Sequence, residues 1–310
     1  MMDKNYFREI TAEFSETSPT NYLSPIAETE EELAVLKHNF YANNFQGHNA
    51  SSSDWAILNK DKPEQYVGMR FYKPPLIAFG SASDEGFKML QEPGVVGPHH
   101  FLPTDWIPGA KTVISIFAPF SDRVVEANAE DTPVPAMEWR YARIDGQQHL
   151  LSTGALIRDS LINAGYKAVM PYSENTYWSK IREDGDNSRP VYSSNWSERH
   201  VAYVAGLGTF GLMTNFISKA GTCGRLASII TDWETTPDEK DYVGAYDYCS
   251  KCRACFKACP AGALSDDGKS IPKCQAFINQ MSKTSLPRVG CGKCMAGMPC
   301  QTKNFSPTIR

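Results

Sequence analysis

Four cysteines between residues 249 and 260, in the sequence CSKCRACFKACP, constrain the fold of this chain more than any other feature. Their C-x2-C-x2-C-x3-C-P spacing is typical of iron–sulfur proteins in which the first three cysteines ligate one cluster and the fourth ligates a second. Zinc sites instead favour paired C-x2-C knuckles, so zinc is the weaker interpretation. The run therefore predicts two clusters, and further thiolates must come from elsewhere in the chain.

Five cysteines lie outside this run, and four of them complete the two cluster sites. With Cys223 set aside, eight cysteines make two four-thiolate cages for 4Fe-4S clusters. The expected ligands of the first cluster are Cys249, Cys252, Cys255 and Cys300. Those of the second are Cys259, Cys274, Cys291 and Cys294. The later cysteines depart from the regular ferredoxin repeat, so other pairings stay open. Cys223 is expected as a buried free thiol beside a strand, the alternative being a place in the cofactor pocket.

The charge of the chain is unevenly distributed. Residues 249–310 contain ten Lys and Arg but two Asp and Glu, whereas the whole chain has a net charge of −4. A basic tail can bind nucleic acid. We favour the interpretation that these cations offset the negative charge of the clusters and tune their potentials. A docking face for an acidic electron donor is a third interpretation, with reduced ferredoxin or flavodoxin as the expected donor.

The composition limits the class of protein. Apolar residues make up 42% and charged residues 21% of the 310 residues, which is ordinary for a globular protein. The N-terminal sequence MMDKNYFREITAEFSETSPT lacks the apolar segment of a signal peptide, and no run is long enough to span a bilayer. Nine cysteines then indicate metal or redox chemistry rather than disulfides. We expect a cytoplasmic protein without membrane contact.

Short apolar runs alternate with helical patterns along the chain. Strands are expected at 74–80, 111–120, 166–172 and 225–232. Helices are expected at 147–164, ended by Gly165, and at 197–206, capped by Ser197 or Asn195. Thr29 and Glu32 form a capping box before another helical stripe. This alternation predicts an α/β (α+β) sandwich. The expected domains are a peripheral extension (1–70), the sandwich (71–240) and a ferredoxin-like double-cluster domain (241–310).

The segment AGLGTFG contains Gly206, Gly208 and Gly211 in the pattern G-x-G-x-x-G, with Asp232 at the interval of a ribose ligand. A dinucleotide-binding fingerprint needs a strand immediately before it, whereas the preceding SERHVAYVA is helical in pattern. The dinucleotide interpretation is therefore disfavoured. The glycines are expected to let the backbone approach a large flat ligand, or to shape a tight turn.

Several segments together resemble the epoxyqueuosine reductase family and, more distantly, the corrinoid reductive dehalogenases. They are SERHVAYVAGLGTFG, the upstream IPGAKTVISIFAPF and WRYARIDGQQH, and the two-cluster cysteine set. The resemblance covers roughly residues 70–300. It implies a nitroreductase-like domain that holds cobalamin base-off at 71–240, beneath a ferredoxin-type module whose clusters deliver single electrons to cobalt.

The resemblance also implies a set of site residues. The segments expected to border the corrin supply Ser194, Asn195, Trp196, Gly206, Leu207, Gly208, Thr209 and Phe210. Family members with a catalytic aspartate carry it six positions before the Glu-Arg pair, where this chain has Tyr192. A tyrosine donates the proton in the dehalogenases, and a phenol can do so when neighbours lower its pKa. The alternative is that Tyr192 packs beside the corrin. Glu198 and Arg199 complete the expected catalytic group, with Arg199 as an anion ligand.

These observations predict a cobalamin-dependent iron–sulfur reductase of a small-molecule substrate. Epoxyqueuosine reduction in tRNA is the second interpretation. It is less favoured because the helical-repeat extension that grips tRNA in longer family members is absent after Cys300 and the net charge is −4. An electron-transfer protein without corrinoid is the third.

Overall fold

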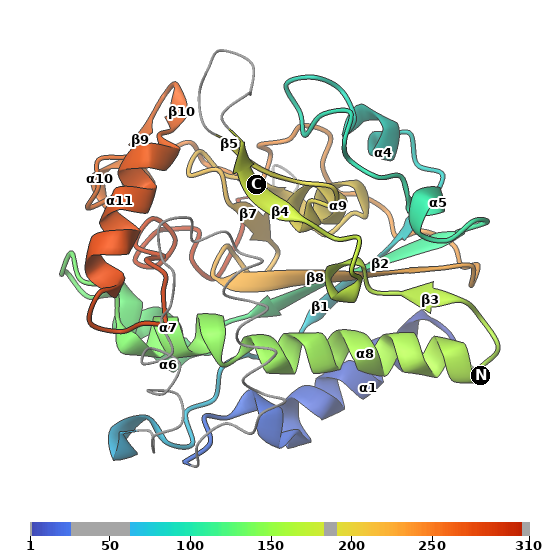
Figure 1. The fold of residues 1–310 in the computed structure, drawn as a ribbon, viewed down its shortest axis with the longest axis horizontal. Coiled ribbons are helices and arrows are strands. Elements are labelled where there is room, and N and C mark those ends of the chain that lie inside the picture. Colours follow the sequence, from blue (N-terminus) through green and yellow to red (C-terminus); the bar gives the residue numbers. More distant parts are fainter. Residues whose placement is uncertain (1, 26–62, 183–190, 306–310) are drawn as a thin grey trace.

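An antiparallel four-stranded sheet lies at the centre of the computed structural model, which describes residues 2–25, 63–182 and 191–305 (Figure 1). In sheet order the strands are β1 (Leu76–Ser81), β2 (Thr112–Pro119), β8 (Gly224–Thr231) and β3 (Ala168–Val169). Three of the four predicted strands are thus confirmed. The run 166–172 yields only β3, because Pro171 lacks the N–H that a continuing strand needs and starts the 3-10 turn η3 (Pro171–Ser173).

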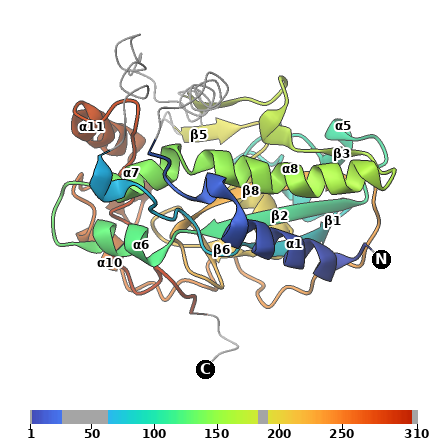
Figure 2. The same ribbon diagram turned by 90° about the horizontal axis from the view of Figure 1, so that it is seen from below.

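Helices cover both faces of this sheet, as Figures 1 and 2 show. On one face lie α8 (Gln147–Asn163) and α1 (Lys4–Thr17), and on the other lies α9 (Glu198–Val204). Successive residues of β2 serve the two faces, since Ile114 shares a core with Leu150 of α8 and Val113 shares one with Val201 of α9. The mixed α/β class is confirmed. Its nitroreductase-like identity stays a prediction.

Helix α1, within the described residues 2–25, packs against this core. Phe7 of α1 is fully buried and packs edge-on against Trp233. Lys4 and Arg8, on the same helix, bind the two carboxylate oxygens of Asp238 at 2.6 and 2.8 Å. An aromatic anchor and two ion pairs thus fix α1 to the sheet and to the segment that leads into the cysteines. The division that makes residues 1–70 a peripheral extension stays a prediction.

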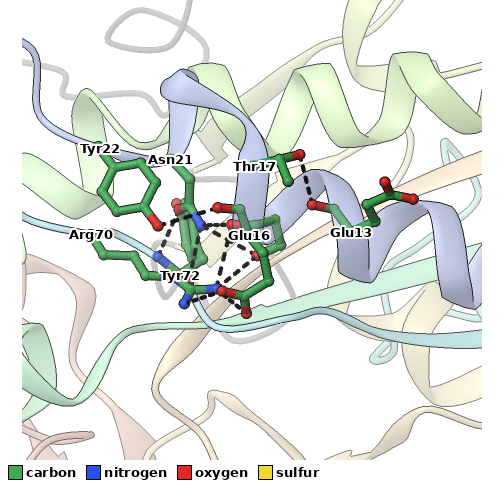
Figure 3. Close-up of polar contacts among 8 residues, drawn as sticks. Glu13, Glu16, Thr17, Asn21, Tyr22, Arg70 and Tyr72 are labelled. Atoms are coloured by element: carbon green, nitrogen blue, oxygen red, sulfur yellow. Dashed lines mark hydrogen bonds and ion pairs between the residues drawn. The ribbon is translucent and has the colours of Figure 1, made fainter.

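A second set of contacts holds the end of α1 (Figure 3). Arg70 binds both carboxylate oxygens of Glu16 at 2.7 and 2.8 Å. Asn21, in the 3-10 turn η1 (Pro19–Asn21), accepts from the Tyr72 backbone N–H and donates to the Tyr72 carbonyl, both at 2.9 Å. The Asn21 side chain thus acts as one more rung beside the extended chain.

The remaining elements are short. They are η2 (Glu64–Tyr66), α4 (Gly86–Met89), α5 (Pro103–Trp106), α6 (Asp122–Ala129), α7 (Met137–Ile144), β4 (Ser179–Arg182), β5 (Val191–Ser194), β6 (Gly208–Phe210), β7 (Phe216–Ser218), α10 (Ala254–Lys257), β9 (Leu264–Ser265), β10 (Gly268–Lys269) and α11 (Ile271–Ser282). The pairs β4–β5, β6–β7 and β9–β10 form hairpins. No helix among the described residues could cross a lipid bilayer. The capping box predicted at Thr29 and Glu32 lies outside them.

The cysteine module, residues 249–305, packs on one end of the sheet region. Its α11 lies beside α7 in Figures 1 and 2. Met213 and Ile217, from the β6–β7 hairpin region, share an apolar core with Tyr248 and Leu264. A buried ion pair adds a second attachment, since Arg288 binds both carboxylate oxygens of Asp145 at 2.7 and 2.9 Å. The three-domain division stays a prediction.

Candidate active site between the sheet and the cysteine module

A cavity of about 790 Å³ lies between the sheet region and the cysteine module. Its walls come from β2, α7, β5, α9 and β8 on one side, and from α11 and the 290–295 loop on the other. The lining is rich in aromatic side chains, with arginines and one carboxylate among them. This combination of a large concave space and a few polar groups is typical of a cofactor or substrate site.

Four of the nine cysteines line this cavity: Cys259, Cys274, Cys291 and Cys294. They are the four predicted as ligands of the second cluster, and we call them the inner thiols. Burial, with a smaller contribution from the neighbouring thiols of Cys294, Cys274 and Cys259, raises the pKa of Cys291 to about 12. The four side chains therefore lie near one another at the cavity wall.

The other predicted ligands, Cys249, Cys252, Cys255 and Cys300, form a second neighbourhood that we call the outer thiols. Burial, with smaller contributions from Cys249, Cys252 and Cys255, raises the pKa of Cys300 to about 12. Cys294 also raises the pKa of Cys255, so the two groups adjoin. Cys252 is exposed. The outer thiols thus reach from the surface to the inner thiols. The cluster pairing itself stays a prediction.

The loop that carries two inner thiols is held by unusual backbone geometry and by α6. Gly292 has φ +66°, and a Cβ atom there would lie 2.1 Å from the indole of Trp139, so no other residue fits without displacement. The buried Lys293 donates to the Asn128 carbonyl at 3.0 Å, and the Asn128 amide donates to the Cys291 carbonyl at 2.9 Å. These contacts fix the loop against the sheet region.

The glycine-rich segment contacts the chain just before the cysteine module. Gly206, Leu207, Gly208 and Thr209 are not among the residues that line the cavity, and their role as cofactor-binding residues stays a prediction. The Thr209 hydroxyl accepts from the Tyr248 N–H at 3.0 Å, and the Phe210 N–H donates to the Ala245 carbonyl at 2.7 Å. A Cβ at Gly208 would meet the Ile217 carbonyl oxygen at 2.1 Å across the β6–β7 hairpin. The tight-turn interpretation of these glycines is therefore the right one.

The dinucleotide interpretation fails on the same segment, as expected. Helix α9, not a strand, precedes Gly206. Asp232, at the interval of a ribose ligand, accepts from the Lys167 backbone N–H at 2.8 Å.

Of the remaining residues predicted to border the corrin, some line the cavity and one does not. Ser194, Trp196 and Phe210 line the cavity. Asn195 does not, because its amide is fully buried and bonded to the backbone of Trp178 and Thr176 at 2.9 Å each. Asn195 thus ties the end of β5 to the 176–178 segment instead of facing the cavity. Ser197 occupies the N-cap position of α9, as predicted, but its hydroxyl bonds to His200 Nδ1 at 2.7 Å instead of capping the helix.

Glu198 lines the cavity and carries a buried carboxylate. Neither carboxylate oxygen has a hydrogen-bond partner among the described residues. Burial raises the pKa of Glu198 to about 7. The Ser228 hydroxyl lies close enough to oppose this rise, although it forms no geometrically sound hydrogen bond to the carboxylate. A carboxyl group with this pKa can hold or release a proton near neutral pH.

Tyr192 lines the cavity from β5, with 40% of its surface exposed. Its hydroxyl donates to the Gln275 side-chain oxygen at 2.6 Å. Burial raises the pKa of Tyr192 to about 12, and nearby Arg143 and Arg199 lower it only in part. Burial outweighs the arginines, so the neighbours of Tyr192 do not bring its pKa below the ordinary value. Its role as proton donor stays a prediction. The phenol keeps its proton at neutral pH.

Three arginines line the cavity: Arg199 of α9, which was predicted, and Arg143 of α7 and Arg225 of β8, which were not. Burial, together with the like charge of Arg225, lowers the pKa of Arg143 to about 9. Burial and Arg225 also lower the pKa of Arg199. One signal was available in the sequence, since Arg225 is the charged residue in the otherwise uncharged strand β8. Cys223 is buried immediately before that strand, as expected.

No single-ion site accompanies these groups. Among the described residues, no three His, Cys, Asp or Glu side chains converge as the ligands of one metal ion do. Two contacts to inner thiols involve sulfur acceptors. The Ala263 N–H donates to Cys259 Sγ at 3.3 Å, and the Asn215 amide donates to Cys294 Sγ at 3.8 Å. Hydrogen bonds of this kind tune the potential of a bound iron–sulfur cluster.

Comparisons with known proteins find relatives of two kinds, epoxyqueuosine reductases and reductive dehalogenases. No protein-family model matches the chain. Its sequence is 26% identical over 231 residues to an epoxyqueuosine reductase of Francisella cf. novicida (strain Fx1), covering 68% of this chain and 58% of that protein. It is 35% identical over 128 residues to a tetrachloroethene reductive dehalogenase of Desulfitobacterium hafniense, covering 39% of this chain and 23% of that protein.

A solved structure of an epoxyqueuosine reductase with a modified tRNA-Tyr stem loop aligns with 74% of this chain and 62% of its own, with a TM-score of 0.47 and 20% identity. The chain thus spans less than two thirds of the length of each of these proteins. Both curated relatives are oxidoreductases by name, in line with the predicted enzyme class. As the resemblance predicts, this chain is similar in sequence to the epoxyqueuosine reductases and to the reductive dehalogenases.

Proposed function

We propose that this chain is a corrinoid-dependent iron–sulfur reductase, with cobalamin in the central cavity and two 4Fe-4S clusters on the two groups of thiols. One observation carries the proposal. The four inner thiols line the same cavity as Tyr192, Glu198 and three arginines, while the outer thiol of Cys252 is exposed. Electrons that enter at the surface would therefore reach the cavity in two short steps.

The cavity residues fit a large, flat and partly polar cofactor. Aromatic and apolar side chains, including Phe210, Phe216 and Leu226, offer a surface for a macrocycle. Besides the Glu198 carboxylate, the buried Thr222 hydroxyl lines the cavity and lacks a partner among the described residues. Such buried polar groups require a bonding partner. Ser194 and Trp196 would border the ring. When bound, cobalamin supplies strongly reducing, nucleophilic cobalt.

The side chains of this chain would bind the ligand, hold the protons to be donated and exclude water from the cavity. Tyr192 holds a proton on its hydroxyl at neutral pH, within the cavity, and Gln275 fixes the direction of that hydroxyl. Glu198 holds a second proton below about pH 7. The aromatic walls exclude water and so strengthen each of these polar contacts.

Epoxyqueuosine in tRNA is the second candidate substrate, beside the small molecule expected from the sequence. Three curated relatives named epoxyqueuosine reductase support it, at 26%, 37% and 31% identity. This support outweighs the charge argument against tRNA. The net charge of −4 is a sum over a basic cysteine module and an acidic remainder, so it does not describe the charge of any one surface. Turnover assays with epoxyqueuosine-containing tRNA, at low and high salt, against a small halogenated compound separate the two substrates.

Cobalamin binding tests the proposal directly. Anaerobically reconstituted protein titrated with cobalamin should show the base-off absorption shift and the matching Co(II) EPR signal. If no corrinoid binds at any concentration tested, the proposal fails and an electron-transfer protein without corrinoid becomes the better interpretation. Iron analysis of the same sample should find about eight irons per chain.

Cys300→Ala tests the assignment of the two groups of thiols. We expect loss of the outer cluster and about four irons per chain, with the inner cluster retained. Cys223→Ala is the matched control, since this buried thiol lies outside both groups. Equal loss of both clusters in Cys300→Ala would contradict the pairing.

A further inference from the structure

Two buried cations lie beside the loop that carries Cys291 and Cys294. Arg140, from α7, is 3% exposed, and Lys293, from the loop itself, is 5% exposed. Burial lowers the pKa of each cation and the Cys291 thiol opposes this fall, which places that thiol within electrostatic range of both. Neither cation is among the residues that line the cavity, so a ligand in the cavity is not their partner.

Both cations contact neutral groups in the described part of the chain. The Arg140 guanidinium donates to the Ser285 hydroxyl at 2.5 Å, and its Nε has no hydrogen-bond partner there. Lys293 donates to two backbone carbonyls at the end of α6, at 3.0 and 3.2 Å. The exposed carboxylates of Glu130 and Asp131 also favour its charged form, but neither forms an ion pair with it. A buried charge without a counter-charge is costly, so both cations require an anion close by.

A cluster on the inner thiols would be that anion. A 4Fe-4S centre with four thiolate ligands has a formal charge of about −2 when oxidised and about −3 when reduced. The loop cannot move away from α7, because Trp139, which precedes Arg140, lies where a Cβ at Gly292 would be. Both cations are thus held beside Cys291, one of the expected ligands.

The outer thiols have a different electrostatic setting. Cys252 is exposed, and so are Lys251 and Arg253 on either side of it. Arg253 also pairs with Asp266 at 2.8 Å. Solvent and salt screen exposed charges, whereas buried charges act at a lower effective dielectric constant. The cations beside the inner thiols therefore have the stronger effect on the charge of a cluster.

We propose that Arg140 and Lys293 are the counter-charges of the inner cluster and raise its reduction potential. This inference rests on the proposed function for the presence of the two clusters. Burial alone disfavours the extra negative charge of a reduced inner cluster and would hold the electron at the surface. Two buried cations offset this effect and favour electron transfer toward the cavity.

The step concerned is the transfer of one electron between the clusters. The reduced outer cluster is oxidised, the oxidised inner cluster is reduced, and no bond forms or breaks. An external one-electron donor, reduced ferredoxin or flavodoxin, then reduces the outer cluster again. The cations act on the inner cluster in this step, because its reduction adds the negative charge that they stabilise.

The competing explanation is that both cations are only structural. Lys293 satisfies carbonyls at the end of α6, and Arg140 ties α7 to Ser285. A structural role predicts that substitutions reduce stability or iron content but leave the potential of an assembled cluster unchanged. Arg140→Lys separates the two explanations, since it keeps the charge and loses the planar fork of the guanidinium.

The test uses the full chain with both clusters reconstituted anaerobically and no corrinoid added. Arg140→Gln and Lys293→Met each remove one buried charge. Lys273→Met is the matched control, because Lys273 precedes Cys274 on α11 but is exposed. Redox titration with dithionite, followed by EPR, measures both cluster potentials, and iron analysis shows whether each variant holds its clusters. The same titration in a Cys300→Ala background, expected to keep only the inner cluster, assigns the inner signal.

We expect Arg140→Gln and Lys293→Met each to lower the equilibrium constant for reduction of the inner cluster by about 10-fold. This change corresponds to about 59 mV for a one-electron couple. The potential of the outer cluster should not change. Arg140→Lys and Lys273→Met should stay within about 2-fold of the wild type, the first because it keeps the charge and the second because solvent screens it.

The inference is overturned if the neutral variants shift neither potential, if they shift both potentials equally, or if Arg140→Lys shifts the inner potential as far as Arg140→Gln does. It is also overturned if the wild type holds no iron–sulfur clusters. If one neutral variant loses its clusters, the other decides, and loss in both overturns the inference in favour of a structural role. Absence of cobalamin binding would refute the proposed function without changing these potentials.

Discussion

The cations at the edges of the sheet region and the cations in the cavity differ in what they contact. At the edges, Lys4 and Arg8 share Asp238, and Arg288 forks onto Asp145. In the cavity, Arg199 and Arg225 contact only neutral groups in the described chain. The cations at these edges are thus matched by carboxylates, whereas these two cavity cations are not. Such departures from local consistency are expected where a ligand binds.

The carboxylates repeat this difference. Asp238 accepts from two cations and from the Phe79 backbone N–H at 3.1 Å. Glu198 is buried without a hydrogen bond to a described residue, and its pKa rises to about 7. One carboxylate holds the N-terminal helix in place, whereas the other is available for proton transfer at neutral pH.

The largest effect is expected where a matched buried pair is broken. Arg288→Met leaves Asp145 buried without its cation, so we expect a loss of about 3–5 kcal/mol in the free energy of unfolding. Both side chains are less than a tenth exposed. Denaturant melts of the cluster-loaded protein measure it. The double variant Asp145→Asn/Arg288→Met should recover much of the loss, and equal losses in single and double variants would mean that the charge is not the cause.

In the cavity, removing the charge of Glu198 should raise the free energy of unfolding instead of lowering it. Because burial holds the folded-state pKa of Glu198 near 7, above its ordinary 4.5, the wild type loses stability as pH rises from about 4.5 through 7. Glu198→Gln removes this loss, so the variant should be more stable by up to about 3 kcal/mol above pH 7 and equal to the wild type below pH 4.5.

The difference in stability between the wild type and Glu198→Gln, followed over pH, isolates the contribution of Glu198. Burial lowers the pKa values of His100, His149 and His200 to about 4, so they make both proteins less stable as pH falls from 6.5 to 4. Their contribution cancels in the subtraction. Thermal melts between pH 4 and 8 give the two curves, and a constant difference across this range would rule out a raised Glu198 pKa.

Short-range patterns predicted most of the framework. The apolar runs that became β1, β2 and β8, and the helix ended by Gly165, needed only local periodicity and a glycine in the left-handed region, which has φ +91°. Cysteine spacing grouped eight thiols; Cys291 interacts electrostatically with the other inner thiols and Cys300 with the other outer thiols, while the assignment of the two groups to two clusters stays a prediction.

The cavity was harder to predict because its residues meet only through tertiary packing. Arg143 and Arg225 are 82 positions apart and share a wall only after β8 pairs with β2 beside α7. Gly206 to Thr209 carry a recognisable pattern, yet their backbone faces Ile217 and the segment before the cysteines. A motif indicates that a residue has a constrained role, but not which neighbour imposes the constraint.

At the partly exposed contact between α1 and Asp238, removing a charge should lower the free energy of unfolding by less than Arg288→Met does. Asp238→Asn weakens two ion pairs and keeps the shape of the side chain, so a loss of about 1–2 kcal/mol is expected. Lys4 and Arg8 are 26% and 40% exposed, which limits the value of each pair through solvent screening. Urea melts at low and high salt measure it. If the loss equals that of Arg288→Met, exposure does not separate the two regions.

The smallest effect on stability is expected at Tyr192, where only one hydrogen bond on the cavity wall is lost. Tyr192→Phe should change the free energy of unfolding by less than about 1 kcal/mol. If its hydroxyl donates the proton, turnover should fall by about 100-fold or more, with cobalamin binding unchanged. Gln275→Leu is the matched control, because it removes the acceptor of the 2.6 Å bond and keeps the phenol. Turnover that survives in Tyr192→Phe would assign Tyr192 to packing and leave Glu198 as the proton source to examine.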